Sequence, residues 1–224
     1  MKNIVLLGAT GSIGDSCLNV IRQNKKHFHL FGIVLGGNLD KAQQITKEFN
    51  PKHIFIAEPH IDKSHDLLHS YPNILSTEDE LQGLIQDPSV DIVISAISGF
   101  AGLKASFFAI DAGKTILIAN KESIVAAGDI LMPLAQAKKS EIIPVDSEHN
   151  AIHQCFPPHS DMKEISKIMI TASGGPFRQK TFKELSEVTL QDALKHPTWS
   201  MGTKITIDSA TLVNKCLELI EAHY

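Results

Sequence analysis

Two carboxylates lie one residue apart in "PVDSEHNAI" (144–152), directly after an apolar run and directly before a histidine. Asp146 and Glu148 would repel each other if both were charged and unpaired. Two oxygen ligands at this spacing can reach one hard cation such as Mg²⁺ or Mn²⁺, which then needs a third protein ligand. A solvated loop explains the pair equally well when the stretch is taken alone.

A second polar group occupies the last helical stretch, "SATLVNKCLELIEAHY" (209–224). Asn214 and Glu218 are spaced i,i+4 and Lys215 follows Asn214, so the three side chains lie on or near one helix face. A carboxylate, an amide and an ammonium suit a metal together with a phosphorylated substrate. An exposed i,i+3 ion pair between Lys215 and Glu218 is the usual alternative.

A glycine-rich turn opens the chain, because "LLGATGSIG" places Gly8, Gly11 and Gly14 between an apolar strand and a helix. Glycines let the backbone turn sharply and approach a pyrophosphate, which binds the free N–H groups at the helix N-terminus. Strand, turn and helix at the start of a βαβ unit are the context that this motif requires. A tight glycine turn without a ligand is the alternative.

The residues at the end of the second predicted strand indicate whether the ribose of such a dinucleotide carries a 2′-hydroxyl or a 2′-phosphate. An acid there would bond the 2′-hydroxyl of NAD and repel a 2′-phosphate. Gly36, Gly37 and Asn38 contain no acid, and none occurs before Asp40. This permits NADP without proving it, because no basic residue occurs before Lys41 either.

Three further stretches carry residues that could bind ligands. Lys121 follows the fifth predicted strand, where open α/β sheets bind ligands, although a surface lysine is the simpler interpretation. "TASGGPF" (171–177) offers Ser173 and glycine N–H groups to a phosphate, or is an ordinary turn. "HPTWSMG" (196–202) lacks periodicity, so its tryptophan is either part of a lid or a packing anchor.

These residues require a sheet to position them. Apolar runs predict strands over 3–8, 30–37, 53–57, 90–97, 114–120 and 141–145. Helical patterns lie between them, over about 12–23, 41–49 and 122–138, and Ser76 or Thr77 is the expected N-cap of another. In the first helix, we expect the apolar residues Ile13, Cys17, Val20 and Ile21 to share one face. Continuous apolar strands alternating with helices predict an α/β fold, a Rossmann-type doubly wound parallel sheet, over residues 1–148.

The regular alternation of apolar strands and helical patterns ends at about residue 148. A strand beginning at 167 is expected to run into the glycine-rich loop, and one helix is expected over 209–224. We therefore expect a second domain to begin near residue 149 and to be unfinished at 224, as in a fragment.

Composition excludes several classes of protein. The 224 residues carry a net charge of −4, so no basic excess suggests a nucleic-acid surface. No apolar run reaches membrane-spanning length. The three cysteines show neither a disulfide framework nor zinc spacing. We expect a cytoplasmic protein that binds neither nucleic acid nor membrane.

The motifs together resemble the 1-deoxy-D-xylulose 5-phosphate reductoisomerase family. "GATGSIG", "GKTILIANKES", "PVDSEHNAI", "SGGPFR", "HPTWSMG" and "DSATLVNKCLELIEA" recur in the family's order and cover the whole chain. The resemblance implies an NADPH-dependent oxidoreductase and isomerase of non-mevalonate isoprenoid synthesis, which uses Mg²⁺, Mn²⁺ or Co²⁺. It also implies that residues 149–224 begin an α+β catalytic domain, that the substrate is a small phosphorylated sugar, and that the full-length form is a homodimer.

The resemblance assigns roles residue by residue. The metal ligands would be Asp146, Glu148 and Glu218, and the catalytic residues Lys121, Glu148 and His196. The substrate-binding residues would be Lys121, Ser147, Glu148, Ser173, His196, Ser209, Asn214, Lys215 and Glu218. The NADPH-binding residues would be Thr10, Gly11, Ser12, Ile13, Gly36, Gly37, Asn38, Asn120, Glu122 and Gly202. The loop with Trp199 and Met201 would be a flexible lid.

One departure from the family concerns the cofactor, since many family members carry a basic residue at the position of Gly37.

The sequence leaves two other functions open. Another NADP oxidoreductase, such as a semialdehyde or homoserine dehydrogenase, would not need an Asp-x-Glu pair with a helix glutamate. A truncated protein that binds a nucleotide without turnover is the alternative outside enzymes.

Overall fold

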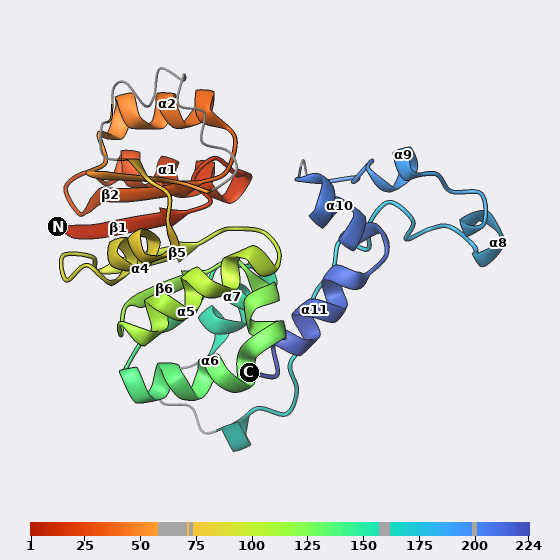
Figure 1. Cartoon of the computed structure of the whole chain (residues 1–224). Coiled ribbons are helices and arrows are strands. Elements are labelled where there is room, and N and C mark those ends of the chain that lie inside the picture. Colours follow the sequence, from red (N-terminus) through yellow and green to blue (C-terminus); the bar gives the residue numbers. More distant parts are fainter. Residues whose placement is uncertain (58–70, 72–73, 157–161, 199–200) are drawn as a thin grey trace. The chain divides into compact units, whose positions relative to one another are not determined.

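The structure is a computed structural model that describes residues 1–57, 71, 74–156, 162–198 and 201–224. The chain divides into two compact units, unit 1 over Met1–Asp146 and unit 2 over Ser147–Tyr224. In Figure 1, unit 1 runs from red to green and unit 2 from teal to blue. The sequence places its boundary between residues 148 and 149, and the structure divides between Asp146 and Ser147.

Unit 1 is built on a parallel sheet of seven strands. They are β1 (Lys2–Leu7), β2 (Phe28–Leu35), β3 (His53–Ile56), β4 (Ile74–Leu75), β5 (Ile92–Ser95), β6 (Thr115–Ile118) and β7 (Ile142–Pro144). All neighbouring strands pair in parallel. The six predicted strands are confirmed; all of them end one or two residues earlier than predicted, and β1 and β2 also begin earlier. β4 was not predicted, because two residues are too few to show a periodicity.

The strand order β4-β3-β2-β1-β5-β6-β7 reverses direction beside β1. The chain first moves outward from β1 to β4, then returns to the other side of β1 with β5 and moves outward again. In open α/β sheets, ligands bind at the carboxyl ends of the strands where this reversal occurs. The loops after β1 and β5 therefore frame the expected crevice.

Helices cover both faces of this sheet (Figure 1). They are α1 (Ser12–Gln23), α2 (Leu39–Phe49), α4 (Glu78–Gln86), the 3₁₀ turn η1 (Phe100–Gly102), α5 (Leu103–Asp111) and α6 (Lys121–Lys138). Alternate residues of β1 belong to two cores, since Ile4 and Leu6 pack with α1 and α2. Val5 and Leu7 pack with α4, α5 and α6. The doubly wound α/β fold is thus confirmed.

The buried face of α1 differs from the predicted apolar face. Gly14 and Leu18 are buried with the predicted Ile21, whereas the predicted Ile13 and Val20 are 38% and 53% exposed. A Cβ added at Gly14 would collide with the backbone carbonyl of Ala9. The glycine thus lets this helix turn lie against the end of β1, and that close approach selects the face.

Thr77 is the N-cap of α4, one of the two expected candidates. Its Oγ1 accepts a hydrogen bond from the backbone N–H of Glu80, and Glu80 Oε2 accepts from the N–H of Thr77 at 2.9 Å. This capping box satisfies two N–H groups that the helix leaves unpaired. The N–H of Ser76 also donates to Glu80 at 2.8 Å, and these bonds lower the pKa of Glu80.

Unit 2 contains helices and irregular segments among its described residues. The helices are α7 (Ser147–Cys155), η2 (Met162–Glu164), α8 (Phe182–Leu185), α9 (Leu190–Ala193), α10 (Thr203–Ala210) and α11 (Val213–Glu221). The predicted strand from 167 is wrong, since residues 165–175 have no regular structure. A strand needs a paired neighbour, and the described part of unit 2 offers none.

The predicted single helix over 209–224 is also wrong, because two helices meet there. Leu212 has a left-handed backbone conformation, with φ of 63° and ψ of 8°, and separates α10 from α11. Thr203–Ala210 forms α10 in spite of its β-branched residues. Thr206 and Ala210 are buried and lie four positions apart, so they form one buried face of the helix.

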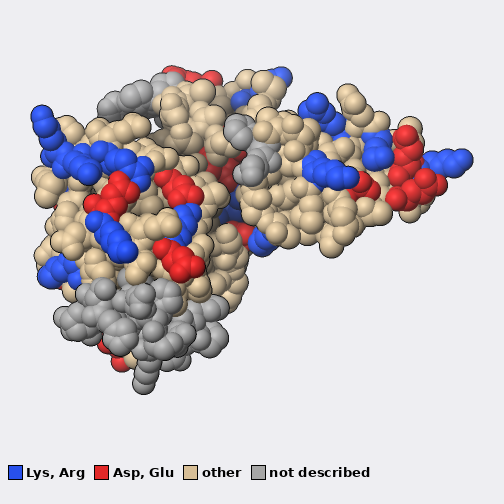
Figure 2. All heavy atoms as spheres, turned by 90° about the horizontal axis from the view of Figure 1, so that it is seen from above, with Lys and Arg blue, Asp and Glu red and all other residues tan. Residues whose placement is uncertain are grey.

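The surface of unit 1 mixes charges of both signs. Figure 2 shows lysine and arginine side chains interspersed with aspartate and glutamate on the face in view. Arg22 pairs with Glu48 and Lys41 pairs with Asp15 on the surface of this unit. Within the described ranges, no helix is both long and apolar enough to cross a bilayer.

Candidate active site

The glycine turn after β1 is held between the ends of two strands. Gly8 has φ of +80°, and its N–H donates to Val34 O at 2.8 Å. A Cβ added at Gly8 would lie 2.5 Å from the carbonyl oxygen of Ala96, so only glycine fits. Gly11 is the N-cap of α1 and has no side chain to cover the N–H groups of the first turn. The turn thus leaves a helix N-terminus open at the switch of the sheet, as a pyrophosphate requires.

The turn after β2 lies against the glycine turn. Asn38 is the N-cap of α2, and its Oδ1 accepts from the N–H of Lys41 at 3.2 Å. The Lys41 ammonium donates to the carbonyl of Thr10 at 3.0 Å and to Asp15 Oδ2 at 2.6 Å. The structure therefore brings the region of Gly37 and Asn38 close to Thr10, whereas the sequence placed them in separate motifs.

Asn120 joins the loop after β5 to the start of α6. It is 1% exposed, and its Nδ2 donates to Ile97 O at 2.5 Å and to Gly99 O at 2.8 Å. Its Oδ1 accepts from the N–H of Ser123 at 3.1 Å as the cap of α6, and Nδ2 also lies 3.2 Å from Glu122 Oε2. Asn120 thus fixes the expected cofactor loop and the first turn that carries Lys121.

Lys121 and Asp146 form a buried ion pair within unit 1. Their side chains are only 5% and 10% exposed. Removing one partner of such a pair leaves an uncompensated buried charge. Lys121 is therefore no surface lysine, and the Asp146 carboxylate lies where a positive charge stabilises it.

Glu148 and Glu218 meet around one ammonium in unit 2. Oxygens of the two carboxylates lie within 4.8 Å of each other, and Lys215 Nζ lies 2.9 Å from Glu148 Oε1. Lys215 also pairs with Glu218, which is 1% exposed and accepts a hydrogen bond from Asn214 Nδ2. Burial opposes the charge of Lys215, but its bonds to Glu218 and Glu148 outweigh this and raise the pKa of Lys215. The sequence alternative of an exposed Lys215–Glu218 pair is wrong, since the glutamate is buried.

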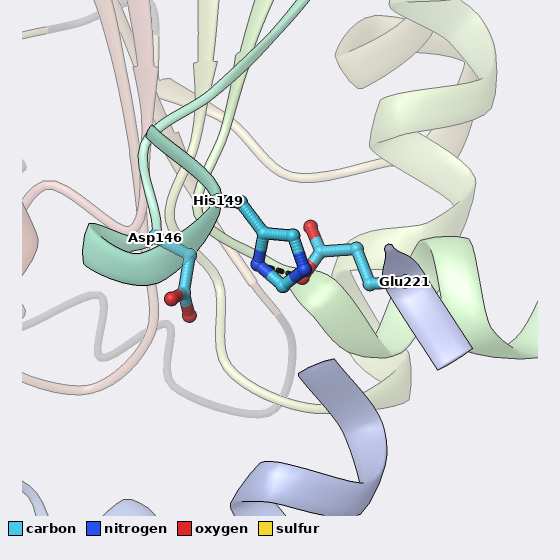
Figure 3. Close-up of side chains that lie close together, drawn as sticks. All are labelled: Asp146, His149 and Glu221. Atoms are coloured by element: carbon cyan, nitrogen blue, oxygen red, sulfur yellow. Dashed lines mark ion pairs between the residues drawn. The ribbon is translucent and has the colours of Figure 1, made fainter. Parts of the chain in front are cut away.

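Two residues that the sequence analysis missed support these carboxylates. His149 Nδ1 lies 3.0 Å from Glu221 Oε2, and His149 Nε2 lies 2.9 Å from the carbonyl oxygen of Glu218. Figure 3 shows the Glu221 carboxylate turned toward the imidazole. Both side chains are buried. They tie α7 to α11 and so keep Glu148 and Glu218 together. The i,i+3 spacing of Glu218 and Glu221 was the available signal.

A polar loop lies beside His196 in unit 2. Ser173 Oγ is 3.0 Å from His196 Nε2, and His196 Nδ1 accepts from the N–H of Thr198 at 3.2 Å. The neutral imidazole therefore carries its proton on Nε2 and donates it to Ser173. Gly174 and Gly175 have φ of +80° and +64°, a conformation that favours glycine.

The remaining predicted residues lie near these groups. A Cβ added at Gly175 would meet Ser209 O at 2.8 Å, so this serine borders the polar loop. Ser147 Oγ donates to Glu148 Oε2 at 2.6 Å. Gly202 is the N-cap of α10, near a cavity of about 400 Å³ that His196 and Met201 help to line. Trp199 lies outside the described residues.

Both units match known protein families. Residues 4–128 match the model for 1-deoxy-D-xylulose 5-phosphate reductoisomerase, and residues 142–224 match the model for its C-terminal domain. A reductoisomerase of Francisella tularensis subsp. novicida is 48% identical over 99% of this chain, which covers 58% of that protein. One of Geobacillus sp. is 46% identical over 100% of the chain and is covered to 59%.

Solved structures agree with these relatives. A DOX-P reductoisomerase in complex with NADPH, fosmidomycin and magnesium superposes with a TM-score of 0.92 at 40% identity. The alignment covers 99% of this chain and 57% of that one. The Zymomonas mobilis enzyme in complex with NADPH gives a TM-score of 0.86, also at 40% identity, over 99% of this chain and 57% of that one. The chain thus spans less than two thirds of the length of the relatives it matches, and it belongs to the 1-deoxy-D-xylulose 5-phosphate reductoisomerase family.

Proposed function

We propose that this chain carries the cofactor-binding and metal-binding parts of a 1-deoxy-D-xylulose 5-phosphate reductoisomerase. That enzyme rearranges 1-deoxy-D-xylulose 5-phosphate and reduces the product with NADPH to 2-C-methyl-D-erythritol 4-phosphate in isoprenoid synthesis. The observation that carries the proposal is the pair of carboxylates, Glu148 and buried Glu218, closed around the Lys215 ammonium. In the proposal, unit 1 is the cofactor domain, and unit 2 begins the metal and substrate domain.

Asp146, Glu148 and Glu218 are the proposed metal ligands. Carboxylate oxygens are the donors that Mg²⁺ and Mn²⁺ prefer, and Co²⁺ also accepts them. The ammonium between Glu148 and Glu218 supports this choice, because it marks a place that already favours positive charge. Asp146 precedes Glu148 by two residues, so the backbone keeps their Cα atoms within about 7 Å. When bound, the cation supplies Lewis acidity toward neighbouring substrate oxygens.

The proposed NADPH contacts come from three turns of unit 1 and from one residue of unit 2. They are Thr10, Gly11, Ser12, Ile13, Gly36, Gly37, Asn38, Asn120, Glu122 and Gly202. The uncapped start of α1 supports binding of the pyrophosphate, since its N–H groups carry no side-chain partner from Gly11. The complexes of two family members with NADPH support the choice of cofactor. When bound, NADPH supplies the hydride for the reduction.

The substrate phosphate would be held in unit 2. Ser173 Oγ and the His196 Nε2 proton point at each other and can both turn to a phosphate oxygen. Ser209, Asn214 and Lys215 add a hydroxyl, an amide and an ammonium, and such donors suit a phosphate dianion. Lys215, which pairs with Glu148 and Glu218, would be free for this role if these carboxylates held a cation instead. Ser147, Glu148 and Glu218 complete the proposed substrate contacts.

Lys121, Glu148 and His196 are the proposed catalytic residues. The Lys121 ammonium is desolvated beside Asp146, so it can orient or donate to a substrate hydroxyl without competition from water. Glu148 Oε2 already accepts a hydrogen bond from Ser147 Oγ and could accept a proton from a substrate hydroxyl. His196 holds its proton on Nε2 toward the phosphate.

The test is the affinity of the 224-residue chain for Mn²⁺, measured by electron paramagnetic resonance of the free ion. Glu148→Gln and Glu218→Gln should each weaken binding at least tenfold. Glu187→Gln, at an exposed position of unit 2, is the matched control and should change nothing. Unchanged Mn²⁺ binding in both site variants would contradict the metal site. NADPH oxidation with 1-deoxy-D-xylulose 5-phosphate then tests turnover.

The proposal includes a homodimer, a cytoplasmic location and no binding to nucleic acid or membranes. The three free cysteines, Cys17, Cys155 and Cys216, support a reducing compartment. Analytical ultracentrifugation of the full-length Francisella tularensis subsp. novicida relative and of this chain measures the number of subunits in each assembly. A monomer in both would contradict the dimer.

A further inference from the structure

A single ammonium joins the two turns that would surround the adenosine of a dinucleotide. Lys41 extends from the first turn of α2 to the glycine turn, where Nζ lies 3.0 Å from Thr10 O. Its second partner is Asp15 Oδ2 at 2.6 Å, on the first turn of α1. The Lys41 side chain is 27% exposed, so its ammonium is accessible from solvent.

The position of Lys41 is unfavourable for its own helix. It is the third residue of α2, counted from the N-cap Asn38, and a cation there opposes the helix dipole. An anion near Lys41 offsets this cost. Asp15 supplies one negative charge from outside the helix, and Asp40 supplies another within the first turn of α2.

The end of β2 has no other charged group to select the ribose. From Leu35 to Asn38, the chain offers two glycines and an amide, so nothing there repels a 2′-phosphate and nothing there attracts it by charge. This is the place where an acidic residue would bind the 2′-hydroxyl of NAD. The nearest basic residue along the chain is Lys41.

We infer that Lys41 determines the preference for a 2′-phosphorylated dinucleotide, with Asp15 as the counter-ion that holds the ammonium when the phosphate is absent. The inference rests on the proposed NADPH site. A 2′-phosphate carries more negative charge than one carboxylate and binds an ammonium as a point charge. Lys41 therefore exchanges Asp15 for the phosphate, while its bond to Thr10 O keeps it beside the turn.

The experiment compares binding of NADPH, NADH, adenosine 2′,5′-bisphosphate and 5′-AMP to the 224-residue chain by isothermal titration calorimetry. Lys41→Ala should weaken NADPH and the bisphosphate at least tenfold and leave NADH and 5′-AMP within twofold. Lys47→Ala, on the same helix, is the matched control and should change none of them. Lys41→Arg should retain the preference.

Asp15→Asn separates this role from a structural one. If Lys41 reads the phosphate, Asp15→Asn frees the ammonium and strengthens NADPH binding about threefold, without an effect on NADH. If the pair only holds α1 and α2 together, Lys41→Ala and Asp15→Asn both weaken the two dinucleotides equally, and the inference is overturned. A wild-type chain that binds no nucleotide contradicts the proposed cofactor site itself. A wild-type chain that binds NADPH and NADH equally contradicts only the role of Lys41.

Discussion

Replacement of Lys215 by methionine tests the electrostatics of the carboxylate pair. Methionine retains much of the apolar stem but removes the charge, so Glu148 and Glu218 then face each other within 4.8 Å. At an effective dielectric constant of about 20, two unit charges at this distance repel by about 3.5 kcal/mol. Glu148 is 19% exposed and Glu218 is 1% exposed, so solvent screens little of this. We expect Lys215→Met to lose about 3 kcal/mol of unfolding free energy without metal.

The assay is urea unfolding of the wild type and of Lys215→Met, with and without 5 mM Mg²⁺. Because no ammonium competes for the carboxylates in the variant, Mg²⁺ should stabilise it more than the wild type and recover most of the loss. Lys195→Met is the control, since that lysine is 74% exposed and pairs with Asp192 at 3.4 Å. It should cost less than about 0.5 kcal/mol and show no extra response to Mg²⁺.

Two results would refute this reasoning. A Lys215→Met protein as stable as the wild type would mean that the two carboxylates do not repel each other as the structure requires. A destabilised variant that Mg²⁺ protects no more than the wild type would mean that Lys215 and its partners are structural and hold no cation.

Four other substitutions have defined outcomes. In a thermal unfolding assay, Gly8→Ala should cost about 2–4 kcal/mol, because φ is +80° and the new Cβ would meet a carbonyl at 2.5 Å. In the same assay, Gly83→Ala, in α4 with nothing within 4 Å, should instead stabilise by about 0.5–1 kcal/mol. The N–H of Asn3 and then the ammonium of Lys2 lower the pKa of Asp91 below its ordinary 3.8. Its contribution to stability is therefore complete above pH 3.8 and is lost as the pH falls through the lowered value, so Asp91→Asn should flatten the acid limb of a stability profile. Leu212→Asn should stabilise by about 0.5 kcal/mol in urea unfolding, since asparagine tolerates the left-handed conformation and Leu212 is 52% exposed; a loss of stability would show that its side chain packs more than its exposure suggests.

The sequence predicted the elements whose signal is local. Continuous apolar runs such as that of β1 predict buried parallel strands, and glycines at 8, 11 and 14 predict the turn that follows. The strand expected from 167 failed because a strand depends on a partner that no local pattern reveals. The break between α10 and α11 at Leu212 was not predicted for a similar reason, since leucine gives no local sign of a left-handed conformation.

In the candidate site, too, the contacts that depend on residues far apart in the sequence could not be predicted. The pairing of Glu148 with Lys215 joins residues 67 positions apart, and the spacing of charges along α11 could only suggest it. His149 and Glu221 were not found, because burial of a histidine against a glutamate depends on how α7 meets α11. Lys121 looked like a surface lysine until the structure showed its partner, Asp146.

The strand order has a consequence for synthesis of the chain on the ribosome. β1 pairs with β2 soon after both emerge, but its other edge waits for β5, which begins at Ile92. At about 5–20 residues per second, the 57 residues from Leu35 to Ile92 take roughly 3–11 s. During that time the nascent chain presents an unpaired, apolar strand edge at what becomes the centre of the sheet. Such an edge can pair with other chains, so this interval is when the nascent protein most needs a chaperone.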